Sequence, residues 1–166
     1  MGGRDPERDE AARGLVARSQ VAAAAAAGHE IGTHSWSHAR LSRRPVRAWV
    51  ELVRSSRALA ASGAPRPRLF RPPYLDWSRS LGVAGAVAGM RPVGWDVDPR
   101  DWEAGDPDEI IGRVYDDASG GSIVLLHDRP DCGATLEALP AIVEGLRDLG
   151  LRPVTVSELL ASPTAG

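Results

Sequence analysis

The stretch Ser122-Ile123-Val124-Leu125-Leu126-His127-Asp128 indicates the fold class. Its apolar run has the length and composition of a strand buried within a parallel sheet. Before it, Asp106-Pro107-Asp108-Glu109 has the N-cap residue and the proline of a helix start, and after it residues 135–149 have an amphipathic helical pattern that ends at Gly150. A buried strand between two helices predicts βαβ units.

The same alternation recurs along the chain. Helices are also predicted over residues 9–27, 45–63 and 77–90, and strands over residues 29–34, 69–70, 92–97 and 153–156. Strands and helices alternate about five times, which predicts an α/β fold, either a doubly wound sheet or a barrel. Because no linker divides the chain, we expect one domain over residues 11–161 with polar tails at residues 1–10 and 162–166.

Composition excludes several classes of protein. The chain has 166 residues, 20 Lys+Arg against 22 Asp+Glu and a net charge of −2, which favours neither nucleic acid nor an anionic membrane as a partner. No stretch approaches the ~18 apolar residues of a membrane span. Residues 1–10 lack the pattern of an export signal. The chain as written is therefore expected in the cytoplasm, and an incomplete N-terminus would favour an extracellular or cell-envelope location.

Polar residues follow four of the predicted strands. They are His34 and His38, then Arg71 and Tyr74, then Asp98, Asp101 and Trp102, and finally His127 and Asp128. The carboxyl ends of parallel strands gather functional residues in α/β folds. We therefore expect the four clusters to face one cleft.

His34 and His38 are the candidate metal ligands. If their segment is helical, the i, i+4 spacing places both imidazoles on one face, within reach of one ion. The alternative is a pair of surface or capping histidines. Three of the four histidines of the chain follow predicted strands, which favours the metal site. Zinc normally takes three protein ligands and an open position for water, so two histidines are an incomplete set.

His127 is the candidate general acid. It ends the most apolar strand, where a charged imidazole needs a balancing carboxylate, and Asp101 is the candidate partner. The alternative is a neutral buried histidine that bonds to the backbone. Cys132 is the single cysteine of the chain, and we expect it to have no chemical role.

The remaining candidates have two interpretations each. Arg71 lies beside two prolines and has the geometry to hold a carboxylate with both guanidinium nitrogens, or it is a surface arginine. Tyr74 supplies either its hydroxyl or its backbone N–H to the cleft. Trp102 lines a sugar-sized pocket or belongs to the core, and Asp98 caps the turn at Pro99.

Four stretches of the chain resemble a known family. They are residues 28–38 (GHEIGTHSWSH), 70–74 (FRPPY), 95–102 (WDVDPRDW) and 125–128 (LLHD). In that order they resemble the polysaccharide deacetylases, the NodB-homology group of carbohydrate esterase family 4. Residues 155–160 (TVSELL) resemble the usual C-terminal close of that family. The likeness covers nearly the whole chain.

The resemblance implies hydrolysis of acetyl groups from an N-acetylated polysaccharide, peptidoglycan- or chitin-like, with one divalent metal, most commonly zinc. It also implies a distorted (β/α) barrel. The implied roles are metal ligation by His34 and His38, support of their loop by Ser35, and orientation of the catalytic carboxylate by Arg71. The others are oxyanion binding by the Tyr74 N–H, proton donation by His127 tuned by Asp101, and substrate contact by Trp102, Tyr74 and Leu125.

One family motif is missing. Thr-Phe-Asp-Asp-Gly, which supplies the general base and the third metal ligand from the first barrel strand, has no counterpart in residues 1–33. A full barrel usually needs at least ~200 residues, so we expect an incomplete barrel that lacks about one N-terminal βα unit. Either the start was assigned too far downstream or the chain is a true truncation with little hydrolysis. A non-catalytic carbohydrate-binding domain and a small-molecule amidohydrolase remain the alternative functions.

Overall fold

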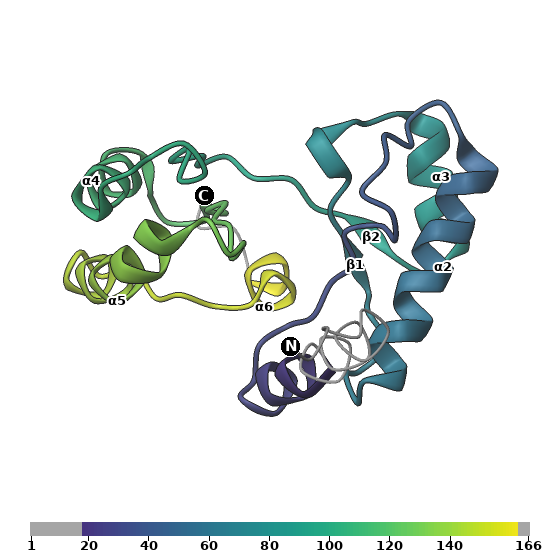
Figure 1. Cartoon of the computed structure of the whole chain (residues 1–166), viewed down its shortest axis with the longest axis horizontal. Helices are drawn as coiled ribbons and strands as arrows, with labels where there is room; N and C mark the ends of the chain where they lie inside the picture. The colour runs from purple at the N-terminus through teal and green to yellow at the C-terminus, as the bar shows by residue number, and fades with distance from the viewer. Residues whose placement is uncertain (1–17, 163–166) are drawn as a thin grey trace, which may run out of the picture. The chain divides into compact units, whose positions relative to one another are not determined.

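The computed structural model describes residues 18–162. The described residues form two compact units that divide between Gly94 and Trp95, and each is described by itself. Figure 1 shows their helices and strands, coloured by residue number from purple through teal and green to yellow. Within residues 18–162, no helix combines the length and the apolar character that a membrane crossing requires.

Within the described residues, the helices of the first unit follow the predicted ones closely, and residues 9–17 of the first predicted helix lie outside the part described. After a helical stretch at residues 18–26 come α2 (Pro45–Ala61), β1 (Leu69–Phe70), the 3₁₀ turn η1 (Pro73–Leu75), α3 (Arg79–Val87) and β2 (Arg91–Pro92). Helix α2 begins with a proline in its first turn, where the missing N–H costs nothing. Helix α3 begins after Ser78, whose hydroxyl accepts the N–H of Leu81 at 3.1 Å.

The first unit contains a small parallel sheet. Strand β1 pairs with β2, and Phe70 also forms a parallel bridge with Thr33. Helices α2 and α3 lie side by side (Figure 1) and contribute half of the core residues. That core consists of Leu41, Ala48, Leu52, Phe70, Leu81, Ala84, Ala88 and Met90. Because β1 and the segment at Thr33 run in parallel, the residues that follow them leave the sheet at the same edge.

The second unit packs helices α4 (Pro107–Asp117) and α5 (Gly133–Asp148) against each other, and the short α6 (Val156–Ala161) follows. Its core is Ile110, Val114, Ala138 and Ile142. The predicted start of α4 is confirmed: the Asp106 carboxylate accepts the N–H of Asp108 at 3.0 Å, and Pro107 is the first helical residue.

The predicted strands of the second unit are shorter than expected. Residues 122–127 form only one parallel bridge, between Val124 and Val97. The strand predicted over residues 153–156 is wrong, because Thr155 caps the N–H of Glu158 at 3.2 Å and Val156 already begins α6. No backbone hydrogen bond joins residues 152–154 to another segment of the part described. A strand needs such a partner, and the incomplete barrel expected from the sequence stays a prediction.

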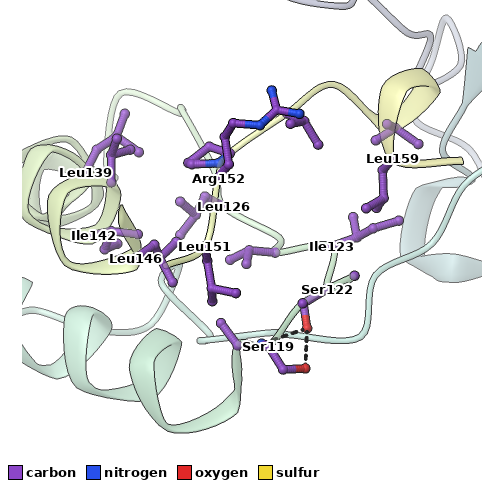
Figure 2. Close-up of a pocket in the computed structure, with 18 residues that line it drawn as sticks. Ser119, Ser122, Ile123, Leu126, Leu139, Ile142, Leu146, Leu151, Arg152 and Leu159 are labelled. Carbon is purple, nitrogen blue, oxygen red and sulfur yellow. Dashed lines mark hydrogen bonds between the residues drawn. The ribbon is translucent and has the colours of Figure 1, made fainter. Parts of the chain in front are cut away.

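An apolar pocket lies in the second unit. Figure 2 shows its lining, which comes from residues 118–126, from α5 and from residues 151–159. The pocket has a volume of about 350 Å³, and Arg152 is the one charged residue in its lining. Catalytic pockets bring several polar groups together. Arg152 is the one titratable side chain in this lining, and none of the residues predicted for the site lines the pocket.

Candidate functional site

The segment that carries His34 and His38 is a tight loop and not a helix. It leaves the sheet where the Arg71 N–H donates to the Thr33 carbonyl at 2.9 Å. Ser35 and His38 have positive φ angles of 68° and 55°, whereas helical residues have φ near −63°. The condition under which the i, i+4 spacing would place both imidazoles on one helix face is therefore not met. The two imidazoles nevertheless lie together, with ring centroids 4.9 Å apart.

Hydrogen bonds orient both rings. Nδ1 of His34 lies 2.8 Å from the carbonyl oxygen of Arg71. A carbonyl only accepts, so Nδ1 carries the proton and, in the neutral ring, Nε2 carries the lone pair. Metal-binding histidines show this arrangement, in which the second ring nitrogen donates to a carbonyl or carboxylate. Nδ1 of His38 lies 3.2 Å from the Tyr74 hydroxyl.

Glu51 of α2 holds the loop between the two histidines. Its carboxylate accepts the backbone N–H groups of Trp36 at 3.1 Å and of Ser37 at 2.8 Å, and the Ser37 hydroxyl at 2.5 Å. Arg47 completes the set with its Nε at 3.3 Å. Burial raises the pKa of Glu51, but the hydrogen bonds from Ser37, Trp36 and Arg47 outweigh it, and the pKa lies below its ordinary value. A hydrogen bond within the loop also stabilises it: Ser35 Oγ accepts the His38 N–H at 2.9 Å.

Tyr74 closes the other side of the histidine pair. Tyr74 and Leu75 both have positive φ angles, 59° and 50°, which non-glycine residues seldom adopt. This turn presents Tyr74 with 58 % of its surface exposed, and the Arg40 guanidinium lies 4.5 Å from the centre of its ring. The roles expected of the Tyr74 N–H and the Arg71 guanidinium stay predictions.

The two histidines fit a divalent metal ion in part. They offer two nitrogen ligands on one loop, with the tautomer of His34 suited to ligation. Among residues 18–162, however, no group of three or more His, Cys, Asp or Glu side chains is arranged to hold an ion. Zinc in a catalytic site normally has three protein ligands. The described residues therefore provide two of the ligands and no third His, Cys, Asp or Glu beside them.

Asp101 and His127 form the second cluster. Asp101 is 1 % exposed, and its Oδ1 accepts from Nδ1 of His127 at 2.7 Å. Its Oδ2 accepts the backbone N–H of His127 at 2.7 Å and the Thr135 hydroxyl at 2.8 Å. Burial raises the pKa of Asp101, but these hydrogen bonds and the nearby imidazole lower it more, so it lies below its ordinary value.

The contact predicted between Asp101 and His127 is therefore present. Because Nδ1 of His127 faces Asp101, Nε2 is the nitrogen left to exchange a proton with a bound molecule. The His127 side chain is 30 % exposed. A partly exposed imidazole beside a buried carboxylate is suited to general acid–base chemistry. That His127 shares one cleft with His34 and His38 stays a prediction.

The other sequence candidates in the second unit have separate positions. Asp98 caps a turn by accepting the Arg100 N–H at 3.0 Å, as expected. Trp102 is not a core residue, because 49 % of it is exposed and the Arg100 guanidinium lies 5.9 Å from the centre of its ring. Leu125 is 5 % exposed. Cys132 is buried and directly precedes α5.

Sequence reasoning missed Glu51 and Thr135. Glu51 lies on the buried face of α2, together with Ala48, Leu52 and Ser55. A carboxylate at that helical spacing was the available signal, because a buried charge needs partners. Thr135 offers no comparable signal, since a threonine in the first turn of a helix is common.

Comparison with known proteins identifies the family. The sequence model described as Polysaccharide deacetylase matches residues 7–93, more than half of the chain. The chain belongs to the polysaccharide deacetylase family. A chitooligosaccharide deacetylase of Bradyrhizobium sp. is 41 % identical over 106 residues, which are 62 % of this chain and 48 % of that protein. The chain thus spans about half the length of this relative.

Solved structures of polysaccharide deacetylase relatives share the α/β fold. A family 4 carbohydrate esterase from Streptomyces lividans, in complex with acetate, is 33 % identical to this chain and superposes with a TM-score of 0.76. The superposition covers 84 % of this chain and 71 % of the esterase chain. A carbohydrate esterase family 4 pseudoenzyme from Bacillus anthracis is 26 % identical and superposes with a TM-score of 0.80. This superposition covers 89 % of this chain and 51 % of the pseudoenzyme chain. The structural neighbours therefore include an esterase and a pseudoenzyme, and likeness of fold alone does not decide which of the two this chain resembles in activity.

Proposed function

We propose that this chain acts in the metal-dependent hydrolysis of acetyl groups from an N-acetylated polysaccharide, chitin- or peptidoglycan-like. The observation that carries the proposal is the His34 ring, whose Nδ1 donates to the Arg71 carbonyl beside the ring of His38. The arrangement presents ligating nitrogens as metal sites require. A relative named as a chitooligosaccharide deacetylase supports the substrate class.

His34 and His38 would hold the metal, and zinc is among the ions that imidazole ligands suit. When bound, a divalent ion polarises a carbonyl oxygen and lowers the pKa of a coordinated water. The two ligands present here would need a third ligand for tight binding. Glu51 and Ser35 contribute by holding the loop that carries both rings.

His127 would donate the proton to the leaving nitrogen. As the amide C–N bond breaks, the nitrogen takes a proton from Nε2 of His127 and departs as an amine. Asp101 keeps the ring oriented through Nδ1 and stabilises its charged form. Tyr74 would supply its N–H to the oxyanion, and Arg71 would orient a carboxylate. Of the two residues proposed for substrate contact, the half-exposed Trp102 is better suited than the buried Leu125 to stack on a sugar ring.

A second candidate function is non-catalytic carbohydrate binding. It is favoured by the absence of a third metal-ligating side chain beside the histidines within residues 18–162. A third candidate is a small-molecule amidohydrolase, which would use the same groups on an amide that is not part of a glycan.

The test measures acetate release from an N-acetylated chito-oligosaccharide by two parent polypeptides and their variants, each with zinc or with a chelator. One is the 166-residue chain. The other is a chimaera in which a family segment carrying Thr-Phe-Asp-Asp-Gly precedes it. We expect zinc-dependent acetate release from the chimaera, and a loss of at least about 100-fold when His127 becomes Ala. A matched chimaera with Asn-Asn in the motif, and the 166-residue chain, should release acetate many orders of magnitude more slowly.

Other outcomes decide between the alternatives. A folded, zinc-loaded chimaera that binds the oligosaccharide and releases no acetate contradicts the deacetylase proposal and supports carbohydrate binding. A chimaera that neither binds nor cleaves the oligosaccharide favours the small-molecule amidohydrolase.

A further inference from the structure

We propose that Thr135 is a positioning residue, whose hydroxyl fixes the carboxylate of Asp101 so that one oxygen faces the ring of His127. The inference deepens the proposed function, since it concerns the residue proposed there as proton donor. The Thr135 hydroxyl bonds to Asp101, and Thr135 acts through that carboxylate.

The geometry assigns each carboxylate oxygen to its own partners. Oδ1 of Asp101 accepts from Nδ1 of His127 at 2.7 Å. Oδ2 accepts the Thr135 hydroxyl at 2.8 Å and the His127 backbone N–H at 2.7 Å. Thr135 is 3 % exposed and Asp101 is 1 % exposed, so water does not compete freely for these bonds.

Thr135 supplies a constraint that His127 cannot. The terminal torsion of an aspartate side chain is broad, so a carboxylate held by one neighbour can rotate together with it. Both other donors to Asp101 come from His127 itself. Thr135 belongs to the first turn of α5, which Ala138 and Ile142 anchor in the core of the unit. The hydroxyl therefore ties the carboxylate to a packed helix.

The same hydrogen bond limits what Asp101 can do. Three donors occupy its oxygens, and each stabilises the ionised form. Arg129, in the loop before α5, adds an electrostatic interaction with Asp101 that is weaker than its interactions with Cys132 and Asp131. Asp101 is thus held as a counter-ion for the imidazole and is poorly suited to take a proton from water.

The experiment follows the carboxyl carbon of Asp101 by ¹³C NMR as acid is added to the 166-residue chain. Thr135→Val keeps the shape of the side chain and removes the donor, so the Asp101 titration midpoint should rise. Thr135→Ser keeps the donor and should restore the wild-type midpoint. Ala138→Gly is the matched control, since it destabilises the same helix without a bond to Asp101, and it should leave the midpoint unchanged.

Two results would overturn the inference: an unchanged midpoint in Thr135→Val, or an equal rise in Ala138→Gly. If Thr135→Val does not fold, the wild-type protein gives a second test. A hydroxyl proton that is buried and bonded exchanges slowly enough to be seen by ¹H NMR, and its absence for Thr135 contradicts the assignment. Neither measurement uses metal or substrate, so a failure of acetate release leaves this result standing.

Discussion

Glu51 and Ser37 are joined by two hydrogen bonds although they lie in different elements. The Ser37 N–H donates to Oε2 of Glu51 at 2.8 Å, and the Ser37 hydroxyl donates to Oε1 at 2.5 Å. Glu51 is 7 % exposed on the inner face of α2. One buried carboxylate thus fixes the loop that places His34 beside His38.

Replacing Glu51 should therefore weaken the fold and the loop together. Glu51→Ala removes the charged acceptor of the Trp36 and Ser37 N–H groups, and hydrogen bonds to a charged group contribute about 1.5–3 kcal/mol each, so we expect a loss of about 3 kcal/mol in the free energy of unfolding. Glu51→Gln keeps one acceptor oxygen and should lose about half as much. Urea unfolding measures both. Arg57→Ala, on the exposed face of α2, should change stability by less than about 0.5 kcal/mol, and an equal loss there would contradict the role of Glu51.

Acid should remove the stabilisation that Asp101 contributes. Its pKa in the folded protein is lowered, so the contribution is complete above the ordinary aspartate pKa of about 3.9 and is lost as the pH falls through the folded value. The difference in unfolding free energy between wild type and Asp101→Asn should be constant at neutral pH and shrink in acid. Urea unfolding at a series of pH values measures it. A difference that stays constant down to pH ~2 would show that the carboxylate is not stabilised in the folded state.

Gly85 should resist substitution although it lies in a helix. A Cβ at this position would overlap the ring of Phe70 in the core. Alanine improves helix propensity by about 1 kcal/mol, but overpacking a core costs about 1–3 kcal/mol, so Gly85→Ala should destabilise the protein. Gly112→Ala in α4, where nothing lies within 4 Å of the added Cβ, should stabilise it by about 1 kcal/mol. Equal effects in urea unfolding would contradict this packing.

The helices were the predictable part of the fold, because their signals are local. Pro45, Pro107 and Asp106 mark helix starts that the structure confirms. Strands depend on partners that are distant in sequence. The sequence of residues 153–156 favours a strand, yet no described segment pairs with residues 153–154, and the Thr155 cap begins α6 directly afterwards.

The candidate site was predictable as residues and not as geometry. The spacing of His34 and His38 indicates that their rings lie close together, but a helix is not the cause. The positive φ angles of Ser35 and His38 bring the two rings together within a loop. The supports provided by Glu51 and Thr135 arise from tertiary contacts between elements. Such contacts leave no periodic trace in a single sequence.

The proposed function requires that His34 and His38 bind one divalent ion, and ¹⁵N NMR of the histidine side chains during a zinc titration tests this most directly. We expect the Nε2 signals of His34 and His38 to move together as zinc binds, while those of His29 and His127 stay in place, and His34→Ala should weaken the response of His38. Zinc that leaves both signals unchanged, or that moves only His29 or His127, would contradict the metal site and the hydrolysis that depends on it.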